Sequence, residues 1–226
     1  MWTPLALSLR VAGLATVLSA AAGILIAAAL AGRRHPLANL LDAGINLPLV
    51  LPPTVLGYYL LVALGARSPL GIWLESLGIR LVFTWQGAVI AASIVALPLI
   101  VQSTKAAIEA VEPSLQDVAR TLGRSEAAIF LSVTLPLAWR GLLAGSMLAF
   151  SRALGEFGAT LMVAGNIPGR TQTLSIAIYD AVQSGNAEAA NWMALLLTTV
   201  AVLLLLGMRT ILQDTGEQFL SLRADL

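Results

Sequence analysis

The chain has 226 residues, of which 58% are hydrophobic and 11% are charged, and its mean hydropathy is +0.86. Soluble domains usually carry about 25% charged residues, so much of this apolar surface must face lipid rather than water. The net charge of +1 gives no electrostatic case for nucleic-acid binding, and the absence of cysteine excludes disulfides and thiolate metal sites. The one histidine, His35, follows two arginines, and we expect no metal site there.

Five apolar stretches are long enough to cross a membrane, which takes about 20 residues in a helix. The sequence therefore predicts an all-α integral membrane protein with about five transmembrane helices in a single domain, residues 1–226. The first stretch is too long for the apolar part of a signal peptide, and arginines rather than a cleavage pattern follow it. The predicted spans are 9–31, 43–66, 81–104, 138–164 and 189–209.

Basic residues are unevenly divided between the two sides of this arrangement. They concentrate on the cytoplasmic side of membrane proteins. We therefore expect a multi-pass protein of the inner membrane with a periplasmic N-terminus and a cytoplasmic C-terminus. One side receives Arg33, Arg34, Lys105, Arg120, Arg124, Arg140, Arg209 and Arg223, and the other receives Arg10, Arg67, Arg80 and Arg170.

Two adjacent prolines, Pro52 and Pro53, interrupt the second predicted span. They remove two backbone donors, so we expect the helix to break or kink there. Non-helical backbone at membrane depth is tolerated only where it is buried in protein or lines a cavity. Either the break is a kink that serves packing, or it forms part of a gate together with Thr54.

The third and fourth predicted spans flank a polar segment, 105–136, that contains a short amphipathic helix. Ser114, followed three residues later by Asp117, suggests a capping box at the helix start, and Gly123 is a natural helix stop. A second helix is expected to start at Ser125. The apolar residues of the first helix fall on one stripe, formed by Leu115, Val118, Ala119 and Leu122. The segment is either a surface connector or a helix that fits a groove on a partner protein.

Two ionisable residues, Arg152 and Glu156, lie inside the fourth predicted span. Such groups are costly in a membrane and need partners, and residues four apart share one helix face. Either they form a mutual ion pair within the bundle, or Arg152 faces a pathway while Glu156 holds its side chain in place. The scattered carboxylates Asp42, Asp180 and Glu188 are interpreted as ordinary loop or helix-end residues.

The same span carries small residues, among them Gly141 and Gly145, that permit close helix approach in lipid. Whether they contact another helix of the same chain or a second copy stays open. Five spans are few for enclosing a pathway, which favours a dimer.

The polar segment resembles the cytoplasmic loop signature of ABC importer permeases. Its Asp117-Val118-Ala119, three residues, Gly123, nine residues and Val133-Thr134-Leu135-Pro136 keep the spacing of that signature. Asp replaces Glu, Val replaces Ala, and Val replaces Ile. The resemblance implies a coupling helix that docks on an ATPase subunit through a set of residues from Leu115 to Pro136. These are Leu115, Asp117, Val118, Ala119, Arg120, Leu122, Gly123, Leu135 and Pro136.

The resemblance also implies a set of partners. They are a second copy of the chain, two cytoplasmic ATPase subunits that bind ATP and Mg²⁺, and a periplasmic substrate-binding protein. The chain has no phosphate-loop motif. We therefore expect no enzymatic activity and no cofactor bound by the chain itself.

Narrower resemblances point to molybdate permeases. They lie in the second span at 49–58, in the fourth at 151–160 and in the following loop at 166–174. Because Gly155-Glu156-Phe157-Gly158 is shared with sulfate permeases, the alternatives are a sulfate or tungstate permease and an ATPase-independent anion carrier or channel. The implied function is import of molybdate by alternating access. The candidate pathway or gate residues are Pro52, Pro53, Thr54, Ser151, Arg152, Gly155 and Glu156.

Overall fold

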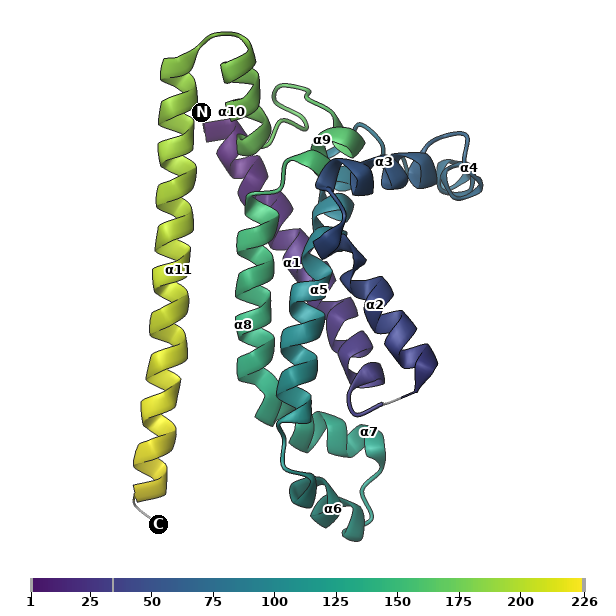
Figure 1. Ribbon diagram of the computed structural model, residues 1–226, viewed down its shortest axis with the longest axis vertical. Helices are drawn as coiled ribbons and strands as arrows, with labels where there is room; N and C mark the ends of the chain where they lie inside the picture. Colours follow the sequence, from purple (N-terminus) through teal and green to yellow (C-terminus); the bar gives the residue numbers. More distant parts are fainter. Residues whose placement is uncertain (1, 34, 225–226) are drawn as a thin grey trace.

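The computed structural model describes residues 2–33 and 35–224, with side chains described up to residue 207. Helices joined by loops make up this part of the chain, which confirms the predicted all-α class (Figure 1). The helices in chain order are α1 (Trp2–Leu30), α2 (Pro36–Val50), α3 (Pro53–Leu64), α4 (Pro69–Ser76), α5 (Trp85–Glu109), α6 (Pro113–Thr121), α7 (Glu126–Ile129), the π-helical turn η1 (Phe130–Thr134), α8 (Leu135–Leu154), α9 (Gly158–Ala164), α10 (Leu174–Gln183) and α11 (Ala187–Ala224).

Four helical runs in the described residues are long and apolar enough to cross a membrane. They are α1, α5, the continuous run 126–154 and residues 187–207 of α11. The bent pair α2 and α3 brings the number to five if it counts as one span. The chain bends by 114° between these two helices, so the break expected at Pro52 and Pro53 is present.

The fourth predicted span, 138–164, is not one continuous helix. Helix α8 ends at Leu154, residues 155–157 are non-helical, and α9 starts at Gly158. Sequence hydrophobicity does not reveal this second break, because the apolar run continues through it. The third predicted span also shifts, from 81–104 to 85–109. Its start is set by the Thr84 side chain, which caps α5 by accepting a hydrogen bond from Gly87 N.

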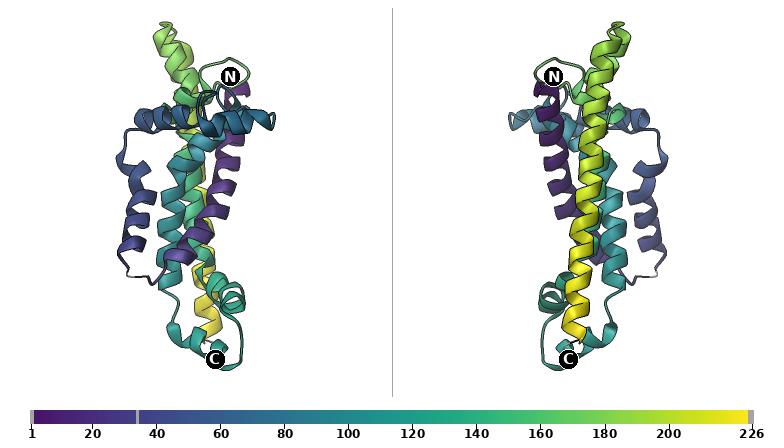
Figure 2. Two further views of the ribbon diagram at one scale, coloured as in Figure 1. Left: turned by 90° about the vertical axis from the view of Figure 1, so that its right-hand side faces the viewer. Right: turned by 90° about the vertical axis from the view of Figure 1, so that its left-hand side faces the viewer.

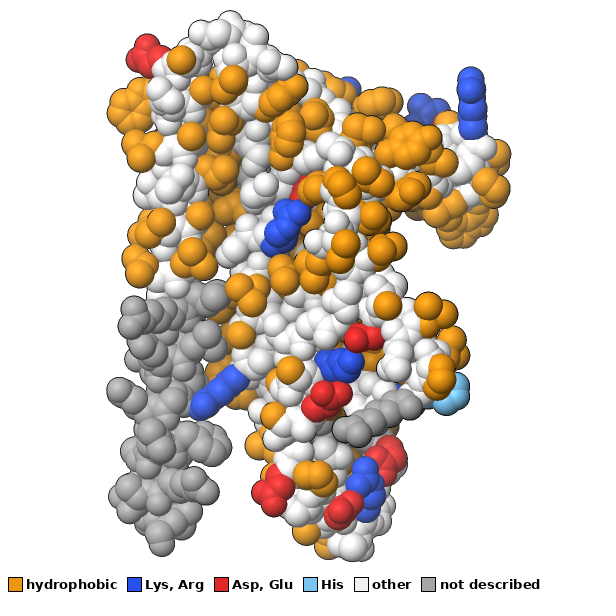
Figure 3. Space-filling model, in the orientation of Figure 1, with side chains coloured by type: hydrophobic (Ala, Val, Ile, Leu, Met, Phe, Trp, Pro, Cys, Tyr) orange, Lys and Arg blue, Asp and Glu red, His pale blue; other side chains and the backbone are white. Residues whose placement is uncertain are grey.

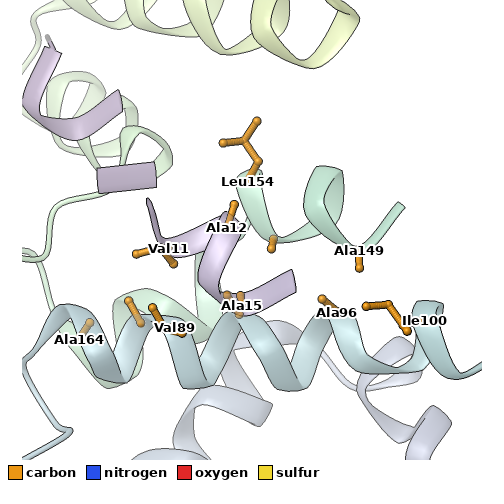
Figure 4. Close-up of a cluster of buried hydrophobic side chains, with 12 residues drawn as sticks. Val11, Ala12, Ala15, Val89, Ala96, Ile100, Ala149, Leu154 and Ala164 are labelled. Carbon is orange, nitrogen blue, oxygen red and sulfur yellow. The ribbon is translucent and has the colours of Figure 1, made fainter. Parts of the chain in front are cut away.

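Helices α1, α5 and α8 form the centre of the bundle around a cluster of buried apolar side chains, most of them alanine (Figure 4). Gly141 and Gly145 of α8 pack against α5 of the same chain, because a β-carbon at Gly145 would lie 2.8 Å from Ser103 Cβ. Of the two alternatives that the sequence left open, this pair of glycines contacts another helix of the same chain and not a second copy. The labelled members of the cluster are Val11, Ala12 and Ala15 of α1, Val89, Ala96 and Ile100 of α5, Ala149 and Leu154 of α8, and Ala164 of α9.

The two ends of the bundle differ. Helices α6 and α7 lie at the end where α11 finishes, which we call the α6 end, and the start of α1 lies toward the opposite end with α10 (Figures 1 and 2). Figure 3 shows hydrophobic side chains over α3, α4 and the upper part of α11, and charged side chains gathered toward α6 and α7.

The predicted division of the basic residues can be compared with the structure only in part. Arg10 lies within α1, where its guanidinium stacks 3.8 Å from the ring centroid of Trp85. Three other members of the predicted count are not placed: Arg34 lies outside the described residues, and the side chains of Arg209 and Arg223 are not described.

Candidate coupling segment and helix breaks

Helix α6 begins two residues earlier than predicted and without the expected capping box. Its N-cap is Glu112, no side chain caps it, and Pro113 stands in its first turn. Proline suits this position because its fixed φ is already helical and its missing N–H has no intrahelical partner there. The capping role predicted for Ser114 and Asp117 is therefore wrong, and the Asp117 carboxylate accepts a hydrogen bond from Arg120 instead.

The end of α6 is as predicted. Gly123 has φ +76°, a left-handed conformation that favours glycine. Its N–H donates to Arg120 O at 2.9 Å, and Arg124 N donates to Ala119 O at 3.2 Å, which satisfies carbonyls in the last turn. Ser125 then caps α7 by accepting from Ala128 N. The reversal between the two helices is thus fixed by local chemistry.

Arg120 links the two helices of the segment. Its Nε and Nη2 donate to the two carboxylate oxygens of Glu126 at 2.6 and 3.0 Å, and its Nη1 donates to Asp117 at 2.7 Å. The hydrogen bonds to Glu126 and then Asp117 raise the pKa of Arg120, and the Arg120 guanidinium lowers the pKa of Glu126. The pair therefore stays ionised below the usual pH range of a glutamate and is lost only as the pH falls through the lowered pKa of Glu126.

The apolar stripe of α6 is exposed rather than packed. Leu122 is 76% exposed, and Leu115 and Val118 are also exposed. Together with Ala119 they line one side of a groove of about 430 Å³ whose other side is formed by the start of α8 and the turn before it. The lining residues are Leu115, Val118, Ala119, Leu122, Ser132, Val133, Pro136 and Leu137.

Pro136 explains the π-helical turn that precedes α8. Proline has no N–H and its ring crowds the carbonyl four residues earlier. The chain widens here, and Leu135 N donates to Phe130 O, five residues back. Such turns often occur at functional sites. Leu135 and Pro136 thus mark the joint between the coupling segment and α8.

The two helix breaks contact each other. A β-carbon at Gly158, the first residue of α9, would lie 3.0 Å from Pro53 Cβ and 3.1 Å from Thr54 N. Behind this contact, Gly57 of α3 packs so closely on α9 that a β-carbon there would lie 2.8 Å from Ala159 Cα. The structure therefore brings together the two segments of the predicted pathway, and Gly57 and Gly158 are the residues that permit it.

Arg152 and Glu156 form an ion pair across the second break. Arg152 Nη1 donates to Glu156 Oε2 at 2.7 Å, and the other oxygen, Oε1, accepts from Ala159 N at 2.8 Å. The Glu156 side chain is 1% exposed and that of Arg152 is 34% exposed. Glu156 therefore holds the start of α9 while it positions a cation that still reaches the surface.

The remaining candidates are placed around these breaks. Pro52, Thr54 and Gly155 are exposed, and the Ser151 hydroxyl donates to Met147 O within α8. The sequence also shows no sign of a polar contact of Asp42, which is not a loop or helix-end carboxylate but lies within α2, 3.3 Å from Lys105 Nζ of α5. Nothing in either local sequence signals a pair that is separated by more than 60 residues.

Comparisons with known proteins now decide the family. Residues 19–215 match the family described as "Binding-protein-dependent transport system inner membrane component". The chain belongs to this family. That assignment confirms the resemblance to importer permeases found in the loop signature, and the apolar helical runs fit an inner membrane component.

Relatives in the family carry more specific names. The Escherichia coli K12 protein named "Molybdenum transport system permease protein ModB" is 43% identical over 189 residues, covering 83% of this chain and 82% of its own. The Bacillus subtilis protein named "Putative molybdenum transport system permease protein YvgM" is 42% identical, covering 90% of each. A more distant relative, the Escherichia coli "Sulfate transport system permease protein CysT", is 32% identical, covering 90% of this chain and 74% of its own.

Solved structures share the fold. A chain of the MetNI methionine ABC transporter in an inward-facing conformation aligns with a TM-score of 0.69 at 19% identity, covering 94% of this chain and 93% of its own. A chain of a bacterial ABC transporter that imports alginate aligns with a TM-score of 0.75 at 15% identity, covering 94% and 78%. At these identities the alignments support the helical fold and carry no information about substrate.

Proposed function

We propose that the chain is the membrane-spanning permease subunit of an ATP-driven importer for molybdate. The observation that carries the substrate is the identity of 40–43%, over most of the chain, to proteins named as molybdenum transport permeases. Identity to the sulfate permease is lower, at 32%. Sulfate and tungstate are therefore the competing substrates that a test must include.

The α6 groove and the contact between the two helix breaks have different roles in this proposal. The exposed stripe of α6 and its groove form the docking face for a cytoplasmic ATPase subunit, which binds ATP and Mg²⁺. The contact between the two helix breaks forms the gate, because it joins non-helical backbone at 51–52 and 155–157 where it can move. Arg152 lends positive potential to an oxyanion that passes the gate.

The path itself is formed by two copies of the chain. No side chain of α2, all of whose residues are described, is buried, and the prolines at the break are exposed. Facing copies would place the two α2–α3 pairs around a shared path. A periplasmic binding protein supplies the substrate. Selectivity lies mainly with that protein, because conduction requires weak binding in the path.

The experiment that tests this function is transport by the purified complex in lipid vesicles. Uptake of labelled molybdate is measured with unlabelled tungstate or sulfate as competitor. We expect molybdate uptake to require ATP, the ATPase subunit and the binding protein, and to resist a tenfold excess of sulfate. Uptake of sulfate in preference to molybdate would reassign the substrate. Uptake by the chain alone would identify an ATPase-independent carrier or channel.

A further inference from the structure

A polar contact at the α6 end connects the broken span to the helix that leads into the coupling segment. The Asp42 carboxylate of α2 has both oxygens occupied. Oδ1 accepts from Gln102 Nε2 at 2.9 Å, and Oδ2 lies 3.3 Å from Lys105 Nζ. Gln102 and Lys105 are three residues apart on α5 and therefore share one face of that helix. The carboxylate is thus fixed in two directions by a single helix.

This contact is partly withdrawn from solvent. The Lys105 side chain is 21% exposed and that of Asp42 is 29% exposed. An ion pair in such surroundings is screened less than a pair on an open surface. Loss of one partner leaves the other charge poorly compensated, which gives a single substitution a large effect.

Helix α2 has little else to hold it. None of its side chains is buried, although all of its residues are described, and α5 is the helix that it mainly contacts. Its other end runs into Pro52 and Pro53, where the bent pair touches Gly158. The Asp42 contact is therefore the polar side-chain link through which a movement of α5 can reach α2.

The end of α5 is in turn joined to the coupling segment. Only residues 110–112 separate α5 from α6. Glu109, the last residue of α5, accepts a hydrogen bond from Gly32 N in the loop that enters α2. A cavity of about 610 Å³ lies among these parts and is lined by residues that include Lys105, Glu109, Pro113 and Gln116. Helices α2, α5 and α6 therefore meet at this end of the molecule.

We propose that Asp42 is a positioning residue that, through Lys105 and Gln102, makes α2 follow α5 when the ATPase moves α6. The proposal rests on the proposed transport function and deepens it, because it names the contact by which a movement at the coupling segment reaches the gate. Breaking the pair uncouples α2 from α5. ATP hydrolysis then continues, but the backbone at Pro52 and Pro53 no longer moves during the ATPase cycle.

The test combines transport with a direct report on α2. Because the chain has no cysteine, Val50→Cys introduces one thiol in each copy of the chain for a nitroxide label at the end of α2, where Val50 is 81% exposed. Spectra of the label are compared between nucleotide-free and vanadate-trapped complex, in the otherwise unchanged chain and with Asp42→Asn. The same preparations are assayed for ATP hydrolysis and molybdate uptake.

We expect the unchanged background to show a nucleotide-dependent spectrum that Asp42→Asn abolishes. Uptake should fall at least tenfold in Asp42→Asn while ATP hydrolysis stays within twofold. The charge exchange Asp42→Lys with Lys105→Asp should recover part of the uptake. Glu75→Gln is the matched control and should change neither signal, because it breaks an exposed pair between Glu75 of α4 and Arg80 in the loop that follows.

Two results would overturn the proposal. One is normal uptake in Asp42→Asn with an unaltered spectral response. The other is a loss of assembled complex in Asp42→Asn that the charge exchange does not restore, since that outcome makes the pair a structural support alone. Failure of the proposed function looks different, because the unchanged chain would then transport no molybdate with any partner.

Discussion

At the scale of single residues, Glu156 has two tasks that can be separated by substitution. Its carboxylate neutralises Arg152 and accepts the N–H of Ala159. Glu156→Ala leaves that buried N–H without a partner, which costs about 1–3 kcal/mol. Glu156→Gln keeps an oxygen that accepts the N–H. We expect Glu156→Ala to lower the midpoint temperature of thermal unfolding of the purified complex clearly more than Glu156→Gln does.

Measurements of molybdate uptake test whether Arg152 acts in transport, apart from the support that Glu156 gives to the start of α9. Both Arg152→Ala and Glu156→Ala should lower molybdate uptake, and the double change should be milder than either single change, because it leaves no unpaired charge. Unchanged uptake in both single variants would remove the pair from the pathway. Loss of all assembled protein would reduce the pair to a support for the bundle.

Gly158 tests whether contact between the two breaks matters. A β-carbon there would lie 3.0 Å from Pro53 Cβ and 3.1 Å from Thr54 N, so Gly158→Ala must push the α2–α3 joint away. We expect a severalfold loss of uptake with little loss of complex. Gly13→Ala on α1 is the control, because nothing lies within 4 Å of the added carbon. Equal uptake by the two variants would argue against a gate at this contact.

At the scale of elements, the reversal after α6 tests coupling without touching the membrane-spanning helices. Gly123 has φ +76° and no atom within 4 Å of an added β-carbon. Gly123→Val is therefore strained by about 1–2 kcal/mol through its backbone alone, whereas Gly123→Asn tolerates the conformation better. We expect Gly123→Val to weaken ATPase association or to let hydrolysis run without uptake, and Gly123→Asn to be much less affected.

Leu122→Asp provides the complementary change at the proposed docking face. Leu122 is 76% exposed, so a charge there costs the isolated chain little but disturbs an apolar contact with a partner. Co-purification of the ATPase subunit measures the effect. If Gly123→Val and Leu122→Asp both assemble and transport normally, the segment is only a surface connector.

Some features of the helices can be predicted from the sequence, and others cannot. The break at Pro52 and the stop at Gly123 follow from the backbone chemistry of one or two residues, and both are present. The break before Gly158 escaped prediction because it depends on Glu156 accepting a backbone N–H within an apolar run. The pair of Asp42 with Lys105 depends on helices that meet only in the folded bundle.

At the scale of the whole molecule, the arrangement of the helices predicts the topology. The start of α1 and the end of α11 lie toward opposite ends of the bundle, and α6 shares the end where α11 finishes (Figure 1). If α6 faces a cytoplasmic ATPase as proposed, we expect a periplasmic N-terminus. Reporter fusions after Gly32 and after Leu226 should both report cytoplasm. A periplasmic signal at Leu226 would refute the five-span topology.

The central claim is that the chain moves molybdate only when a partner's ATP hydrolysis reaches it through α6. It is tested most directly by molybdate uptake into vesicles that contain the unchanged complex or the Leu122→Asp complex, with ATP hydrolysis measured in the same samples. The account predicts ATP-dependent uptake in the first and at least a tenfold loss in the second. Equal uptake in both, or uptake without ATP, would contradict it.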